Sequence, residues 1–200
     1  MDHAVKHLPN VTLIATDGLN PERTRRVMRY CESLFTFGGS VLIESPRTYE
    51  DAMRCEISEL HLHFKTTHCL FVSHDGWILN PQLWDDRWLD YDMIGAPWPS
   101  AWGLKHRVGN TGFSLRSWAF LKASADAIGL WNRQPGDVFQ CQTLHQPMVE
   151  LGMKFAPVEI ARRFSWEHYI EEGDCGPACS FGFHGWVAGK TPERYNAMLQ

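Results

Sequence analysis

Three short hydrophobic runs, separated by helical patterns, constrain the fold of this chain most strongly. Residues 11–16 (VTLIAT), 41–43 (VLI) and 69–73 (CLFVS) are all β-branched or apolar except the final Ser73, as is typical of buried parallel strands. Apolar residues recur every three or four positions over residues 27–35 and 53–64, which predicts two intervening helices. The first helix is expected to start at Asn20-Pro21 and to end at Phe37-Gly38-Gly39. This alternation predicts an α/β fold with a mostly parallel sheet flanked by helices.

The second half of the chain is less regular. We expect strands at residues 91–95 and 154–158, a helix over 117–128, and another helix from about 137 until Pro147. No internal repeat and no linker interrupts the pattern. The 200 residues are therefore predicted to form a single domain.

Charge and composition exclude several classes of protein. The formal net charge is −4, and no run of Lys or Arg exceeds two residues, which makes a duplex nucleic-acid binder unlikely. No apolar run approaches the roughly 18 residues that a membrane span needs, and the N-terminus shows no secretory signal. We therefore expect a cytoplasmic protein without a membrane span.

Six cysteines are scattered along the chain, three of them inside apolar segments. Cys175 and Cys179 enclose three residues, but no second ligand pair follows at zinc spacing. We predict two ordinary thiols there, with a disulfide or a local loop as the alternatives.

Several motifs occur in a fixed order over most of the chain. They are residues 75–81 (DGWILNP), 84–86 (WDD), 91–99 (YDMIGAPWP), 109–117 (GNTGFSLRS), 137–139 (DVF) and 181–185 (FGFHG). This ordered set resembles an uncharacterised bacterial glycosyltransferase-like family of GT-A type. Two positions depart from the pattern: His74 stands where Trp is expected, and Gly136 stands where an acid is expected before Asp137.

The resemblance implies a nucleotide-sugar-binding half, at about residues 11–105, and an acceptor-binding half, at about 106–190. The implied activity is transfer of a sugar from a nucleoside-diphosphate donor, with a UDP-sugar favoured, to an acceptor hydroxyl. The acceptor is expected to be a glycan or another hydroxyl-bearing molecule, and a modified nucleobase is an alternative acceptor.

Asp75 follows the third predicted strand, at the edge of the sheet where ligands bind in such folds. Departure of a diphosphate needs positive charge, and carboxylates hold Mg²⁺ or Mn²⁺ well. The resemblance therefore implies that Asp75 and Gly76 contact the donor and that Asp75 binds the cation. Since Asp-Gly is also a strong turn former, a plain turn is the alternative. His184 is the candidate second metal ligand, and a packed loop histidine is its alternative.

Asp137 has two explanations on sequence alone. As an N-cap it would stabilise the helix that follows, and as a general base it would take the proton from the acceptor hydroxyl. The resemblance favours the base, because it places Asp137 in the acceptor-side acidic motif.

The remaining candidates are assigned by their position in the expected fold. Thr16 and Asp17 follow the first strand, where GT-A folds contact the nucleotide. Asn110 and Gly112 lie in a glycine-rich turn that a sugar could approach closely, and Trp98 offers a flat ring for stacking on a sugar. Each has a structural alternative: a turn for the first four, and packing under a loop for Trp98.

Two further functions compete with glycosyl transfer. One is a non-catalytic module that binds a nucleotide sugar or glycan, motivated by Gly136. The other is a nucleotidyltransferase, which would release pyrophosphate. Dehydrogenase, P-loop kinase and α/β-hydrolase functions are disfavoured, because none of their glycine-rich motifs occurs in the chain.

Overall fold

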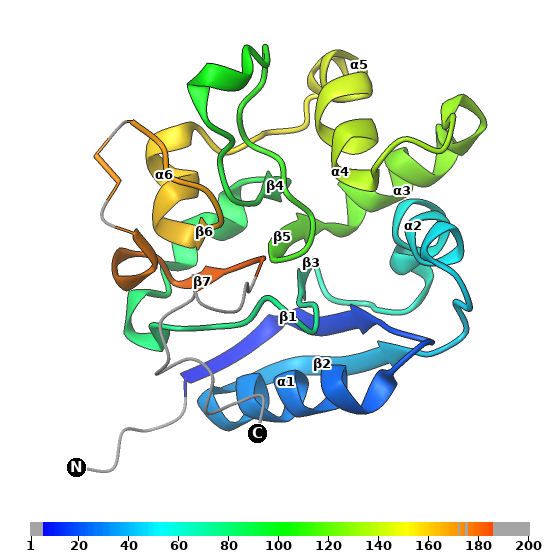
Figure 1. Cartoon of the computed structure of the whole chain (residues 1–200). Coiled ribbons are helices and arrows are strands. Elements are labelled where there is room, and N and C mark those ends of the chain that lie inside the picture. The colour runs from blue at the N-terminus through cyan, green and yellow to red at the C-terminus, as the bar shows by residue number, and fades with distance from the viewer. Residues whose placement is uncertain (1–5, 172, 175, 186–200) are drawn as a thin grey trace.

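The computed structural model describes residues 6–171, 173–174 and 176–185. A five-stranded sheet with strand order β2-β1-β3-β5-β4 forms its centre, as Figure 1 shows, and a small sheet of β6 and β7 lies beside it. The strands are β1 (Lys6–Thr16), β2 (Phe35–Ile43), β3 (His68–Phe71), β4 (Met93–Ile94), β5 (Ser114–Ser117), β6 (Ser165–Trp166) and β7 (Gly182–Phe183). The helices are α1 (Pro21–Leu34), α2 (Tyr49–Ser58), α3 (Trp118–Asp126), α4 (Gly136–Val138), α5 (His145–Glu150) and α6 (Val158–Phe164), with a π-helical turn (Phe139–Thr143) between α4 and α5.

Four of the five strands of the central sheet point the same way. β1 pairs in parallel with β2 and with β3, whereas β5 is antiparallel to both β3 and β4. The predicted α/β fold with a mostly parallel sheet is therefore confirmed. Strand order reverses between β1 and β3, so the carboxyl ends of these two strands form the crevice where ligands bind in open α/β sheets.

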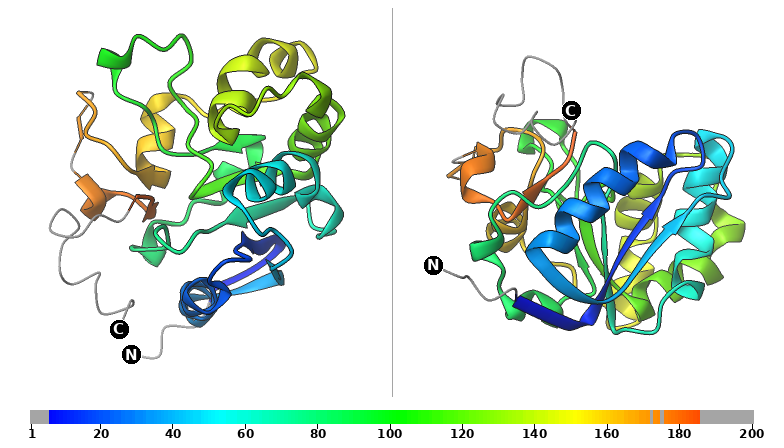
Figure 2. Two further views of the ribbon diagram at one scale, coloured as in Figure 1. Left: turned by 45° about the vertical axis from the view of Figure 1, so that its right-hand side comes forward. Right: turned by 90° about the horizontal axis from the view of Figure 1, so that it is seen from below.

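The sheet separates two hydrophobic cores. Successive side chains of a strand face opposite sides, so Leu13 and Leu70 pack into one core while Ile14 and Phe71 pack into the other. Helix α1 lies against the first face of β1 and β2 (Figure 2), and α2 and α3 cover the second face. In this three-layer arrangement the helices cover the two faces of the sheet, and the carboxyl ends of β1 and β3 border a cavity.

Two predicted boundaries differ from the structure. Residues 35–39 begin strand β2 rather than end helix α1, because the backbone of Phe35 to Phe37 pairs with Lys6 to Leu8 of β1. The strand expected at 154–158 is reduced to one bridge, between Phe155 and Met93. The start of α1 agrees with the prediction, with Asn20 at the N-cap and Pro21 in the first turn.

The cysteines divide into two kinds. Cys31, Cys55, Cys69 and Cys141 are buried free thiols, one more than the three that the apolar patterns predicted. Cys179 is disulfide-bonded, so the prediction of an ordinary thiol is wrong there, and Cys175 lies outside the described residues. Since disulfides are rare in a reducing cytoplasm, the cytoplasmic location stays a prediction.

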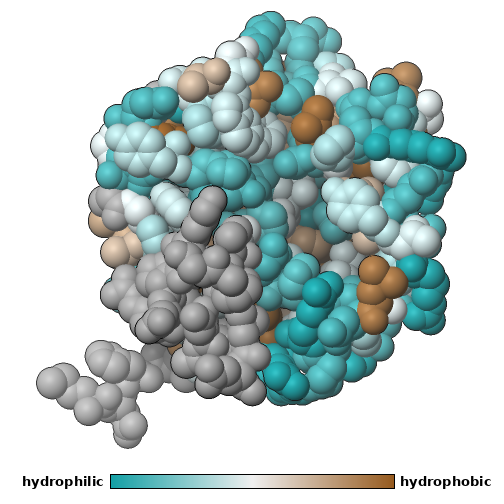
Figure 3. Space-filling model, in the orientation of Figure 1, coloured by the Kyte–Doolittle hydropathy of each residue, from teal (hydrophilic) through white to brown (hydrophobic). Residues whose placement is uncertain are grey.

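Within the described part of the chain, no helix has the length and apolar character needed to cross a bilayer. On the face drawn in Figure 3, the described residues are mostly hydrophilic, and hydrophobic side chains occur singly or in small groups.

Candidate active site

The largest concentration of predicted site residues lines one cavity at the carboxyl ends of β1 and β3. The cavity has a volume of about 420 Å³, and its walls come from the ends of these strands, from α2, from the first turns of α1 and α4, and from the loops around them. Seven of the predicted residues line it: Thr16, Asp17, Asp75, Asn110, Gly112, Asp137 and His184. Residues far apart in the sequence thus meet where the strand order reverses.

Asp75 is held by a tight turn directly after β3. Ser73 and Gly76 exchange backbone hydrogen bonds of 3.3 and 3.2 Å, and Ser73 Oγ donates to Asp75 Oδ1 at 2.7 Å. His184 Nε2 lies 3.4 Å from the same carboxylate oxygen. Burial raises the pKa of Asp75, but its interactions with His184 and Ser73 outweigh burial and leave this pKa well below its usual value. Asp75 is therefore ionised at neutral pH.

His184 lies between two carboxylates. Its Nε2 faces Asp75, and its Nδ1 lies 3.1 Å from Glu167 Oε1. Burial lowers the pKa of His184, whereas the two carboxylates raise it, and the net result is a pKa of about 10. The imidazole is therefore a half-buried cation at neutral pH.

Two predicted glycines make room for His184. A Cβ on Gly112 would lie 2.1 Å from His184 Nε2, and a Cβ on Gly76 would lie 2.9 Å from the Phe183 carbonyl oxygen and 3.1 Å from His184 Cδ2. Gly76 does not line the cavity. The observed role of both glycines is therefore to let the Phe183–His184 segment lie close to the two turns that contain them.

Asn110 orients the same cluster from the glycine-rich turn. It adopts a positive φ of 35°, a region that Asn tolerates better than most residues. Its Oδ1 accepts a 3.1 Å hydrogen bond from Gly112 N, and its Nδ2 contacts both Glu167 and His184. Asn110 therefore links the predicted glycine-rich turn to Glu167 and His184.

Asp17 is engaged by its own loop. Its Oδ1 accepts hydrogen bonds from Leu19 N and Asn20 N, and its Oδ2 accepts from Arg23 Nε and Thr24 Oγ1, over distances of 2.7 to 3.1 Å. Burial raises the pKa of Asp17, but these hydrogen bonds lower it by more, so the pKa lies below its usual value. The carboxylate thus fixes the start of α1, as the turn alternative predicted.

Asp137 faces the cavity from the first turn of α4. The N-cap of this helix is Pro135, which makes no side-chain cap, so the structure does not support the N-cap role for Asp137. Burial raises the pKa of Asp137, a backbone hydrogen bond from Val138 lowers it, and the net shift is upward. A half-buried carboxylate of raised pKa has the properties that a general base needs.

Trp98 does not belong to the cavity. It is only 4% exposed and packs in the core on the α2 side of the sheet. A Cβ on Gly109 would lie 1.8 Å from its ring, so the glycine is needed for this packing. The prediction of a sugar-stacking role for Trp98 is therefore replaced by its structural alternative.

Two acidic residues of the site were not predicted. Glu56 lines the cavity from α2, and Glu167 follows β6 and pairs with His184. Glu56 could have been found, because it lies three residues after Met53 and four before Leu60, on the apolar stripe of its helix. Glu167 carries no comparable signal, since its partner lies beyond an irregular loop.

The predicted metal ligands form a pair of donors. A carboxylate oxygen and an imidazole nitrogen 3.4 Å apart are close enough to share one divalent ion. Among the described residues, no group of three or more His, Cys, Asp or Glu side chains is arranged to hold a metal. Asp75 and His184 would therefore need oxygens from a ligand or water to complete the coordination, as Mg²⁺ sites often do, and His184 would first release its proton.

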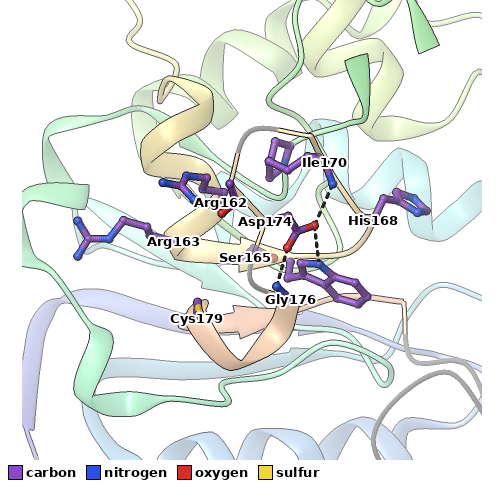
Figure 4. Close-up of a pocket in the computed structure, with 11 residues that line it drawn as sticks. Arg162, Arg163, Ser165, His168, Ile170, Asp174, Gly176 and Cys179 are labelled. Carbon is purple, nitrogen blue, oxygen red and sulfur yellow. Dashed lines mark hydrogen bonds between the residues drawn. The ribbon is translucent and has the colours of Figure 1, made fainter. Parts of the chain in front are cut away.

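A second cavity, of about 240 Å³, lies beside β6 (Figure 4). Asp174 occupies its centre and accepts hydrogen bonds from Ile170 N, Gly176 N and Trp166 Nε1, at 2.9, 2.6 and 3.3 Å. Arg162 Nη1 donates to the Gly173 carbonyl oxygen. These groups organise their own loop, and none of them was predicted as a site residue.

A family model matches residues 40–184, and its description is "Protein of unknown function (DUF5672)". The chain belongs to the DUF5672 family. The match covers more than half of this DUF5672 protein and includes Glu56, Asp75, Asn110, Asp137 and His184. No curated protein matches the sequence.

A solved structure supports the fold of this DUF5672 protein. It is described as the crystal structure of a glycosyltransferase involved in the glycosylation of the major capsid of PBCV-1. The two chains share 13% sequence identity with a TM-score of 0.57, and the match covers 95% of this chain and 99% of the other. At this identity the comparison shows a shared fold over nearly the whole length, and the fold alone does not establish the reaction.

Proposed function

We propose that this protein is a glycosyltransferase that moves a sugar from a nucleoside-diphosphate donor to an acceptor hydroxyl. The observation that carries the proposal is the meeting of Asp75, His184 and Asp137 at one cavity between the ends of β1 and β3. The shared fold with the PBCV-1 glycosyltransferase supports the same reaction class.

In this proposal, the end of the cavity at Asp75 and His184 binds the diphosphate. A divalent cation bound there would supply positive charge against the leaving diphosphate. Asp75 is ionised and anchored by Ser73, so it is prepared to hold such an ion. Glu167 and Asn110 fix the orientation of the His184 ring.

Asp137 is the proposed base. The acceptor oxygen forms a bond to the anomeric carbon while the bond from that carbon to the diphosphate oxygen breaks. The acceptor proton passes to the Asp137 carboxylate, and the nucleoside diphosphate leaves with the electron pair. Because burial raises the pKa of Asp137, its carboxylate has a stronger tendency to accept a proton than an exposed aspartate.

The decisive experiment uses purified protein with UDP- and GDP-hexoses in the presence of Mn²⁺ or Mg²⁺. We expect nucleoside diphosphate to be released by transfer or slow hydrolysis, with UDP-hexoses preferred. Failure of the protein to bind any nucleotide, measured by calorimetry, would count decisively against the proposal.

A non-catalytic binding module is the second candidate, because Gly136 leaves Asp137 without the expected acidic neighbour. A Cβ on Gly136 would lie 3.3 Å from Met53 Sδ, so this position serves the packing of α4 on α2. Donor binding without turnover in any acceptor mixture would favour the module, and release of pyrophosphate would favour a nucleotidyltransferase.

A further inference from the structure

One carboxylate in the cavity wall has no role in the mechanism proposed above. Glu56 lies on the buried face of α2, between Cys55 and Ile57, and is 6% exposed. Thr16 Oγ1 donates a 3.1 Å hydrogen bond to its Oε1. Its Oε2 has no hydrogen-bond partner among the described residues and is not one of the fully enclosed polar atoms, so this oxygen is open to the cavity.

No described cation neutralises Glu56 by direct contact. The charges of Arg116 and His184 favour the ionised form of Glu56 without an ion pair to it. Arg116 itself stacks on Phe71, with its guanidinium carbon 4.8 Å from the ring centre, and donates to Gln140 Oε1 at 3.2 Å. Arg116 therefore packs behind Phe71, which lines the cavity, and forms no ion pair with Glu56.

A carboxylate in this setting is unfavourable for folding. Burial raises the pKa of Glu56 to about 7, against the smaller opposing effects of Arg116 and Thr16. The two other buried residues of α2, Cys55 and Ile57, are apolar, as packing against a hydrophobic core favours. A buried acid that lines a cavity and costs stability is characteristic of a ligand-binding residue.

The chemistry of the position limits what it can bind. Of the charges that act on Glu56, those of Arg116 and His184 favour its carboxylate and that of Asp137 disfavours it, but none of the described cations forms an ion pair with Oε2. A phosphate placed directly against Oε2 would therefore meet the charge of the carboxylate itself, whereas neutral hydroxyl groups donate well to a carboxylate oxygen. The donor molecule of the proposed reaction has such groups on its sugar.

We propose that Glu56 forms a hydroxyl-binding subsite for the transferred sugar, in which Oε2 accepts a hydrogen bond from one sugar hydroxyl while Thr16 holds Oε1. The position of that hydroxyl then determines which donor sugar fits. This inference rests on the proposed function, because it assigns the substrate contact of the same cavity.

The test compares Glu56→Gln with wild type by calorimetry, using UDP, GDP and their glucose, galactose and mannose conjugates with Mn²⁺. Gln keeps the size of the side chain and an oxygen for Thr16, but replaces the open oxygen with an amide that cannot accept. We expect the affinity for the free nucleoside diphosphate to stay within about twofold, and the affinity for the preferred conjugate to fall at least about tenfold. Glu50→Gln, an exposed position on the same helix, is the matched control and should change neither.

Deoxy sugars sharpen the test, because each removes one hydroxyl from the donor. The analogue that lacks the hydroxyl bound by Glu56 should bind wild type and Glu56→Gln equally, whereas the parent conjugate should not. Thr16→Val is a second variant, expected to weaken conjugate binding in the same direction by a smaller factor. Thermal unfolding of each variant shows that it is folded.

The possible failures are distinguishable. If wild type binds no nucleotide, the proposed function fails and this inference fails with it. If wild type binds a conjugate, but Glu56→Gln changes free diphosphate and conjugate equally or changes neither, the subsite is wrong and the proposed function stands. Unchanged binding with lost turnover would instead make Glu56 a proton acceptor and would overturn the subsite.

Discussion

His184 Nε2 lies 3.4 Å from Asp75 Oδ1, although the two residues are far apart in the sequence. The turn after β3 presents Asp75, and β7 delivers His184 beside it through the spaces left by Gly76 and Gly112. This pair is the centre of the candidate site, and the first two predictions depend on it.

Asp75→Asn should abolish the response to the cation. A neutral amide cannot balance a divalent ion, so we expect the rate of nucleoside diphosphate release to fall at least about 100-fold and Mn²⁺ stimulation to disappear. Initial rates over a Mn²⁺ titration measure this. Asp90→Asn, at an exposed aspartate that ends the 3-10 helix Asp86–Asp90, should behave as wild type. An Asp75→Asn enzyme with normal rate and normal Mn²⁺ response would exclude the role of Asp75.

Gly112→Ala should displace His184 from its position between the carboxylates. The new Cβ would lie 2.1 Å from His184 Nε2, so the ring must move. We expect nucleotide affinity to fall at least about tenfold and the free energy of unfolding to fall by about 1–3 kcal/mol. Gly129→Ala has no heavy atom within 4 Å of the added Cβ and should change stability by less than about 0.5 kcal/mol. If Gly112→Ala and Gly129→Ala had the same nucleotide affinity and the same free energy of unfolding, the close contact between Gly112 and His184 would be contradicted.

Asp137→Asn should separate catalysis from binding. If Asp137 is the base, the amide should reduce kcat by about 10²- to 10⁴-fold while donor affinity stays within about threefold. Stability should not fall, because Pro135 rather than Asp137 occupies the N-cap and burial disfavours the charged carboxylate. Steady-state kinetics and urea unfolding measure the two effects, with Asp126→Asn as an exposed control. An unchanged kcat would remove Asp137 from the mechanism.

Glu56 should make the protein less stable as the pH rises. Its pKa is about 7 in the folded protein, against an ordinary value of 4.5 for a glutamate in water, so the folded state binds its proton more tightly. That stabilisation is complete below pH 4.5 and is lost as the pH rises through 7, an effect of up to about 3 kcal/mol.

Urea unfolding of wild type and Glu56→Gln at pH 5 and pH 8 measures this contribution. The difference in unfolding free energy between the two pH values should be smaller in Glu56→Gln, and this variant should be the more stable protein at pH 8. The same pH dependence in both proteins would show that Glu56 does not titrate in this range.

Trp98 and Trp102 should respond differently to truncation. Trp98 is 4% exposed and packs on Gly109, so Trp98→Ala should cost about 3–5 kcal/mol of unfolding free energy. Trp102 is 52% exposed, with its ring centre 5.0 Å from that of His168, so Trp102→Ala should cost less than about 1 kcal/mol. Thermal or urea unfolding decides the order, and a larger loss for Trp102 would contradict the observed burial.

The sequence alone determined the elements and the residues that follow them. The hydrophobic run of β3 predicted a buried strand, and that strand necessarily presents Asp75 just beyond its carboxyl end. Pro21 predicted the start of α1, and the alternation of strands and helices predicted the α/β fold. These features depend on local spacing and backbone geometry, which neighbouring residues largely fix.

Only the tertiary structure decided which side chains meet and which are already engaged. It paired His184 with Glu167, turned Glu56 into the cavity, buried Trp98 and used both oxygens of Asp17 within its own loop. It also made residues 35–39 a strand, because β1 offers them backbone partners. Such contacts join residues distant in the chain, so they depend on strand order and on the path of the loops, which local sequence patterns do not encode.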